Sequence, residues 1–161
     1  MYLFNLRYTF KYPKNNINLQ NFYNKHFYYF RIISFKFYIY IMSKTKDTTL
    51  NTLNNIIEAI KEKKGKNICS LNFEKISNSI CDYFVICEAD NRPMVEAIVD
   101  EIEKQVKQNN NVRPHHVEGM ENATWVLIDY FDVIVHIFQD DYRNFYNLEK
   151  LWADAEIINY S

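Results

Sequence analysis

The chain has 161 residues, with 19 Lys or Arg against 20 Asp or Glu, and a formal net charge of −1. This total hides a division at Met42: residues 1–41 contain six basic residues and no acidic ones, which leaves thirteen basic and all twenty acidic residues in 42–161. The 120 residues from Met42 onward therefore carry a formal charge of −7, which argues against non-specific binding to nucleic-acid phosphates and favours a basic protein partner. A segment of this length suits one domain with one hydrophobic core.

Residues 1–41 admit three interpretations, in order of preference. Phe, Tyr, Asn, Ile, Lys and Leu make up 33 of these 41 residues, the composition that translated AT-rich DNA upstream of a gene would have, with Met42 as the start. A transit peptide comes second, because acidic residues are absent although Arg and Ser are few. A membrane anchor comes last, since the apolar stretch 27–41 contains Arg31 and Lys36 and has 15 residues, whereas a span needs about 20.

A helix and two strands are predicted first in the segment 42–161. Apolar residues at spacings of three and four indicate one buried helix face, formed by Leu50, Leu53, Ile57 and Ile60. Gly65 is a typical helix stop. The alternating pattern of Asn67–Phe73 predicts a half-buried strand, and the continuous apolar run Tyr83–Cys87 predicts a central strand that is buried on both faces.

A second helix is predicted after Asp90 or Asn91, either of which can cap it, with Pro93 in the first turn. Its buried stripe is formed by Val95, Ile98, Val99, Ile102 and Val106. The segment Val112–Val117 then predicts a short edge strand, because Pro114 cannot donate a hydrogen bond within a sheet.

The final elements predicted are a hairpin, from Trp125–Asp129 and Asp132–Phe138, and a last helix over Asp141–Trp152. On that helix we expect Phe145, Leu148 and Trp152 in the core, with Tyr142, Tyr146 and Glu149 partly exposed on another side. The order of elements predicts a single α/β domain in which flanking helices pack on a mixed sheet of about five strands.

The residue types that carry chemistry are sparse. A metal-dependent nucleotidyltransferase that uses Asp82 with Asp129 or Asp132 is the alternative function. The position two residues after Asp82 is Phe84 rather than a second carboxylate, and no Gly-Ser pair precedes it. Carboxylates that cap turns or strand ends are therefore the preferred interpretation, and no catalysis is expected.

Metal binding is not predicted either, because the cysteines lack the close pairing of a zinc site and are expected to be buried free thiols. They are Cys69, Cys81 and Cys87. His115 and His116 are adjacent, so in a strand their side chains should point to opposite faces. His136 lies in an apolar run, where a hydrogen-bonded core histidine is expected.

Four blocks of the sequence are distinctive rather than generic. They are Asp82–Ile86, the pair Glu118-Gly119 ahead of Trp125, the pair Asp129-Tyr130 before Val133–His136, and Arg143–Trp152. In this order they resemble the ribosomal silencing factor family, also called the Iojap family. The resemblance covers the chain from Leu50 to Ala155. Many members of the family have Gly where this chain has Phe131 and Ala153, which predicts an exposed aromatic at the hairpin turn and an extended last helix.

The resemblance implies a fold related to nucleotidyltransferases, with no cofactor and no metal. It implies a translational repressor that binds the large ribosomal subunit through a protein of its intersubunit face and sterically blocks joining of the small subunit. A role in ribosome biogenesis, a minor contact to ribosomal RNA and a weak homodimer of the free protein are left open. The expected location is the cytoplasm, or an organelle if residues 1–41 are a transit peptide. The residues expected to form or support the docking surface are Trp125, Asp129, Tyr130, Val133, Tyr146, Leu148 and Trp152.

Overall fold

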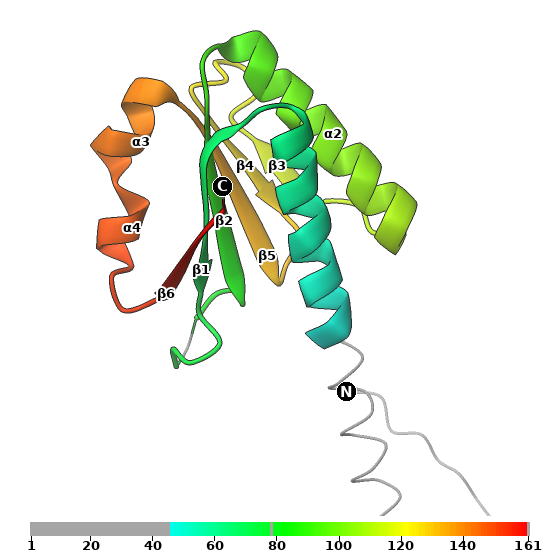
Figure 1. Ribbon diagram of the computed structural model, residues 1–161, viewed down its shortest axis with the longest axis vertical. Helices are drawn as coiled ribbons and strands as arrows, with labels where there is room; N and C mark the ends of the chain where they lie inside the picture. Colours follow the sequence, from blue (N-terminus) through cyan, green and yellow to red (C-terminus); the bar gives the residue numbers. More distant parts are fainter. Residues whose placement is uncertain (1–45, 78, 161) are drawn as a thin grey trace, which may run out of the picture. The chain divides into compact units, whose positions relative to one another are not determined.

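The computed structural model describes residues 46–77 and 79–160, so the interpretations of residues 1–41 lie outside the described residues. The described strands form one sheet between two groups of helices (Figure 1). The strands are β1 Lys66–Asn72, β2 Tyr83–Ala89, β3 His116–Glu118, β4 Trp125–Asp129, β5 Val133–Gln139 and β6 Glu156–Tyr160. The helices are a first helix over residues 46–62, α2 Arg92–Asn110, α3 Asp140–Tyr146 and α4 Leu148–Leu151.

The sheet is mixed, as predicted. Its strand order is β3-β4-β5-β2-β1-β6, in which β2 and β5 are parallel and every other neighbouring pair is antiparallel. Strand β2 lies near the centre, and all of its residues are buried, which confirms the reading of the continuous apolar run. The hairpin of β4 and β5 is confirmed within one residue at each end.

The sheet has six strands within the described residues rather than about five, because β6 was not predicted. It pairs antiparallel with β1 at the outer edge, where the Tyr160 hydroxyl and Ser70 Oγ lie 2.9 Å apart. At the opposite edge, β3 covers three residues, so the edge strand predicted over Val112–Val117 begins later, and Pro114 lies outside the ladder.

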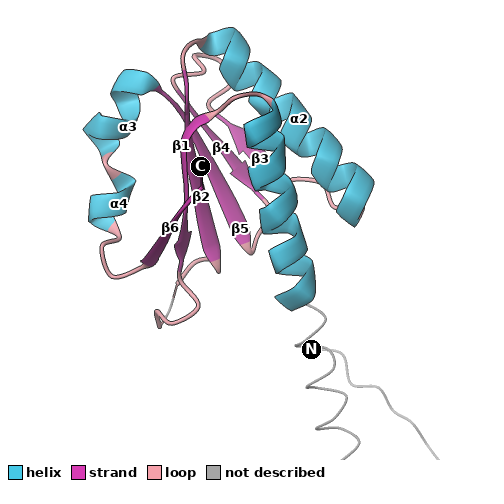
Figure 2. Cartoon of the chain, in the orientation of Figure 1, coloured by secondary structure: helices cyan, strands magenta, loops and turns pink. Residues whose placement is uncertain are grey.

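The first helix and α2 pack on one face of the sheet, while α3 and α4 lie on the other (Figures 1 and 2). The predicted stripe of α2 is buried, and its start follows the predicted cap: the Asn91 side chain accepts a hydrogen bond from Met94 N at 3.0 Å. Side chains from both helices and from the near face of the sheet form the larger hydrophobic core.

The last helix predicted over Asp141–Trp152 is in fact two short helices, so that expectation is wrong. Asn147 separates α3 from α4 with φ 43°, a left-handed conformation that no continuous helix contains. The Asn147 side chain caps α4 by accepting from Lys150 N at 3.3 Å. Ala153 lies in the turn after α4, so it does not extend the helix as expected.

No helix in residues 46–77 and 79–160 is long and apolar enough to cross a membrane. The stretch 27–41, which was considered as an anchor, is not among these residues.

Candidate docking surface

The face of the sheet that carries α3 and α4 is covered only in part. Because side chains alternate along a strand, Trp125, Leu127 and Asp129 of β4 share this face, and all are half-buried, whereas Val126 and Ile128 are buried on the opposite face. A second, smaller core lies here beneath α4; it includes Phe84, Phe138 and Leu148, with Trp125 and Trp152 packed against it. The half-buried side chains of β4 are therefore partly accessible to a partner and lie next to a well-packed core.

Trp125 is held in one orientation by its neighbours. Its indole Nε1 donates a hydrogen bond to His136 Nδ1 at 3.2 Å, and its ring stacks on Phe138 with centroids 5.1 Å apart. Burial lowers the pKa of His136 to about 4, so the imidazole stays neutral and can accept this bond. His136 is thus the hydrogen-bonded core histidine that the sequence predicts.

The aromatic rings continue from the sheet onto α3. The Tyr146 ring lies 4.5 Å from that of Trp125, and the Phe145 ring lies 5.1 Å from that of Tyr146. We call these three residues, Trp125, Tyr146 and Phe145, the aromatic ridge. Tyr146 is 44% exposed and Phe145 is 80% exposed. The prediction that Phe145 lies in the core is therefore wrong, because the break at Asn147 ends the helical spacing that would have aligned it with Leu148.

Helix α3 contributes no buried side chain to the core, and polar contacts attach it to the sheet. The guanidinium of Arg143, whose side chain is 11% exposed, contacts Glu88 Oε1 at 3.2 Å and Glu149 Oε1 at 2.5 Å. It also donates to the carbonyl of Asn67 and to Cys69 Sγ. Arg143 thereby ties α3 to α4 and to strands β1 and β2, and this cluster fixes the position of the ridge.

The remaining predicted docking residues divide between the two faces. Leu148, the first residue of α4, is buried in the smaller core, as expected. Trp152, which packs edge-on against Phe73 and Phe84, is half-buried against the same core. Tyr130 and Val133, 5% and 1% exposed, belong to the core under the first helix and α2. These two residues can support the surface from behind but cannot contact a partner at the ridge.

Two residues with positive φ shape the strands around this surface. Gly119 has φ +85°, and a Cβ at this position would overlap the backbone carbonyl of Trp125. Phe131, at φ 67°, makes the turn between β4 and β5 and is 63% exposed, which confirms the expected exposed aromatic. Its amide donates to Asp129 Oδ1 at 2.7 Å, so Asp129 organises this turn.

Two of the three carboxylates considered for nucleotidyl transfer, Asp129 and Asp132, have structural partners. Thr49 Oγ1 donates to Asp132 Oδ2 at 3.1 Å, and Asp129 accepts from the turn. Burial, followed by the charge of Asp132, raises the pKa of Asp82. No group of three or more His, Cys, Asp or Glu within residues 46–77 and 79–160 could hold a metal ion. The three cysteines are free and buried, as predicted, and burial raises the pKa of each thiol to between about 11 and about 12.

The fold and this surface define the chain as a small α/β domain that presents aromatic side chains on a supported sheet face. A family model described as ribosomal silencing factor during starvation matches residues 46–161. The chain therefore belongs to this family, which confirms the resemblance seen in the sequence blocks.

Similarity to individual proteins agrees with this family assignment. The ribosomal silencing factor of Halalkalibacterium halodurans is 43% identical over 102 residues, covering 63% of this chain and 86% of that protein. The chloroplastic protein Iojap of Arabidopsis thaliana is 34% identical over 79 residues, covering 45% of this chain and 30% of that protein. A crystal structure from Chromobacterium violaceum superposes with a TM-score of 0.61 at 30% identity, covering 65% of this chain and 85% of that chain.

Proposed function

We propose that this protein represses translation by binding the large ribosomal subunit through a protein of its intersubunit face, so that the small subunit cannot join. The family assignment supports the silencing role, and the observation that carries the docking surface is the aromatic ridge. The rings of Tyr146 and Phe145 are exposed although the ridge rests on a packed core, and aromatic anchors with such support are typical of the centres of protein interfaces. Occupying the intersubunit face is sufficient for this function, so it requires no catalytic residue.

The charge around the ridge supports a basic partner. Asp140 and Asp141 at the start of α3 are exposed, as is Asp154 after α4. Arg143 is engaged in ion pairs, which leaves Lys150 as the exposed base of residues 140–154. A ribosomal protein next to ribosomal RNA carries positive charge, and complementary potentials speed and orient association.

The proposed docking residues have different roles. Trp125 and Tyr146 contact the partner. Asp129 lies on the same face of the sheet, at the other end of β4 from Trp125. Leu148 and Trp152 support α3 and α4 from below, and Tyr130 and Val133 support the hairpin from the opposite face. These roles follow from exposure: Tyr146 is 44% exposed, whereas Leu148 is 8% exposed.

The cellular location of the protein is inferred from the members of the same family. Bacterial relatives suggest work on cytoplasmic ribosomes, and the chloroplastic relatives suggest organellar ribosomes instead. A contribution to assembly of the large subunit would use the same surface, because a factor on the intersubunit face also blocks premature joining during assembly.

The docking surface can be tested with Tyr146→Ala in the full chain. We expect its affinity for purified large subunits of Bacillus subtilis to fall about tenfold or more, as for an interface anchor. Its melting temperature should change by no more than a few degrees, because half of the ring faces solvent. Ile158→Ala on β6 is a matched control, since Ile158 is 43% exposed and its pairing with Ser70 puts it on the sheet face opposite to the ridge.

The control should bind large subunits as tightly as the parent protein. Equal binding by Tyr146→Ala would show that the ridge does not dock. A large drop in melting temperature for Tyr146→Ala would show instead that this ring is structural.

A further inference from the structure

A second group of exposed rings lies at the β3 edge of the sheet. The rings of His116 and His115 have centroids 4.5 Å apart, and His115 lies 4.4 Å from Phe131 of the hairpin turn. All three side chains are exposed. His115 precedes β3, and its ring meets that of His116, so the expectation that the two histidines point to opposite faces is wrong.

Backbone hydrogen bonds, rather than burial of the side chains, fix the positions of these three residues. His115 N donates to the carbonyl of Asp129 at 2.7 Å, which fixes the chain just before β3. The left-handed φ of Phe131, 67°, is unfavourable for a bulky residue, and the Asp129 carboxylate stabilises it. Three flat, solvent-facing rings are thus presented in a row by a fixed piece of backbone.

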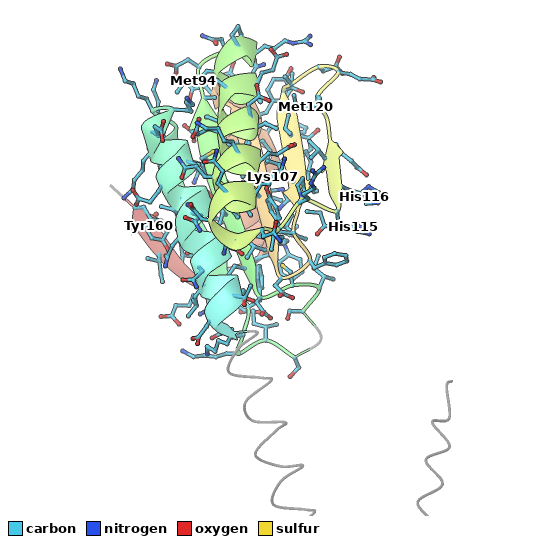
Figure 3. All side chains as sticks on the ribbon, turned by 90° about the vertical axis from the view of Figure 1, so that its right-hand side faces the viewer. Met94, Lys107, His115, His116, Met120 and Tyr160 are labelled. Carbon is cyan, nitrogen blue, oxygen red and sulfur yellow. The ribbon has the colours of Figure 1, made fainter. Side chains whose placement is uncertain are left out.

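A cationic side chain, Arg113, closely precedes the rings in the sequence. Lys107, near the end of α2, and Arg113, two residues before His115, are exposed and line a shared hollow of about 550 Å³ with Lys104 and Pro114. Among the described residues, neither Lys107 nor Arg113 forms a salt bridge, whereas Lys104 is paired with Glu101. Figure 3 shows Lys107 on α2 and both histidines at the outer edge of the sheet.

Carboxylates limit the positive charge here. Asp100 and Glu103 line the same hollow, so this is not a broad basic field, and non-specific binding of phosphate backbones is not expected. Stacking must therefore carry most of the interaction, with Arg113 as the cation that adjoins the rings in the sequence. Rings flanked by a few cations are the arrangement that proteins use for unpaired bases.

The edge also continues the docking surface. His116 pairs with Asp129 across β3 and β4, so both side chains are on the face that carries Trp125. This edge is therefore open to RNA that adjoins a partner protein seated on the ridge. Resting on the proposed function, we propose that His115, His116 and Phe131 form a stacking platform for unpaired nucleotides of ribosomal RNA, with Arg113 contacting an adjoining phosphate.

The direct test places a photo-reactive p-azidophenylalanine at position 131 or at position 145 of the full chain. Each protein is bound to purified large subunits of Bacillus subtilis and irradiated. Position 131 should crosslink to ribosomal RNA, and position 145, in the ridge, should crosslink to a ribosomal protein. The two positions thus report the two surfaces separately.

Substitutions provide a second readout in the same binding assay. Phe131→Asn removes the ring while keeping a residue that tolerates positive φ, and it should weaken binding about tenfold, as for the loss of one stacked base. Arg113→Gln should lower the slope of log affinity against log salt by about one. Lys64→Gln, at an exposed lysine after the first helix, is the matched charge control and should leave that slope unchanged.

The outcomes distinguish the two proposals. If position 145 crosslinks to protein while position 131 also yields only protein, the RNA platform is wrong and the docking proposal stands. Parent-like binding by Phe131→Asn and Arg113→Gln would likewise overturn the platform. If the parent protein does not bind large subunits at all, both proposals fail together.

Discussion

Gly119 shows how one backbone position determines the placement of a side chain six residues later. A Cβ at position 119 would overlap the carbonyl of Trp125, and the φ of +85° is itself unfavourable for L-residues. The pair Glu118-Gly119 ahead of the Trp-containing strand therefore has a physical reason: the chain must pass directly over the start of β4.

We predict that Gly119→Ala lowers the free energy of unfolding by at least about 2 kcal/mol, because left-handed strain and backbone overlap add. Urea unfolding followed by tryptophan fluorescence measures this change. Gly119→Asn separates the two causes, because Asn tolerates positive φ yet still carries a Cβ. Recovery of full stability in Gly119→Asn would show that overlap with Trp125 is unimportant.

His136 makes stability depend on pH in a defined window. Its pKa is about 4 in the folded protein and about 6.5 when unfolded, so between these values the unfolded chain binds a proton that the native state does not. Stability attributable to this group is therefore fully present above pH 6.5 and decreases as pH falls toward 4, by about 3 kcal/mol in total.

Unfolding measured from pH 4 to pH 7 tests this linkage. His136→Gln retains an acceptor for the Trp125 indole but cannot titrate. The free energy of unfolding of this variant should therefore fall less steeply with decreasing pH, with a slope that corresponds to about one proton fewer taken up on unfolding. Parallel pH profiles for the two proteins would contradict the assignment of a neutral, buried His136.

At the scale of elements, α3 differs from the rest of the fold because an ion cluster anchors it. We predict that Arg143→Leu lowers the free energy of unfolding by about 3 kcal/mol, because Glu88, 8% exposed, would keep a buried charge without its partner. Chemical denaturation measures the change. Arg143→Lys keeps the charge but lacks the forked geometry, and it should show a smaller loss. An unchanged stability in Arg143→Leu would mean that the cluster does not hold α3.

The elements that sequence patterns predicted well are those whose pattern is long or chemically specific. Strand β2 is a continuous apolar run, and α2 combines a cap at Asn91 with a regular stripe. Strand β6 was missed because its five residues are mostly exposed and neither alternate clearly nor form an apolar run. Its consecutive β-branched Ile157 and Ile158 were the available signal.

The sequence indicated the composition of the candidate surface better than its geometry. The aromatic excess of Arg143–Trp152 indicated a surface, but a left-handed Asn147 is a backbone event that helical spacing cannot anticipate. That single break moved Phe145 from the expected core to 80% exposure. The family resemblance grouped Tyr130 and Val133 with Trp125, although both residues lie in the core on the other face of the sheet.

For the molecule as a whole, residues 42–161 are acidic, and the two proposed contact regions differ in their local charge. The aromatic ridge is accompanied by Asp140, Asp141 and Asp154, whereas Arg113 precedes the β3 edge. A ribosomal site, where basic protein adjoins RNA, presents both complements together. A basic protein alone or an RNA alone would complement only one of the two regions.

The most direct test of this account is sucrose-gradient sedimentation of the full chain with mixed ribosomal subunits at low magnesium. We predict co-migration with free large subunits, absence from small subunits and joined ribosomes, and fewer joined ribosomes when magnesium is raised in its presence. A protein that stays at the top of the gradient, or that binds large subunits without hindering their joining, would contradict the proposed occlusion.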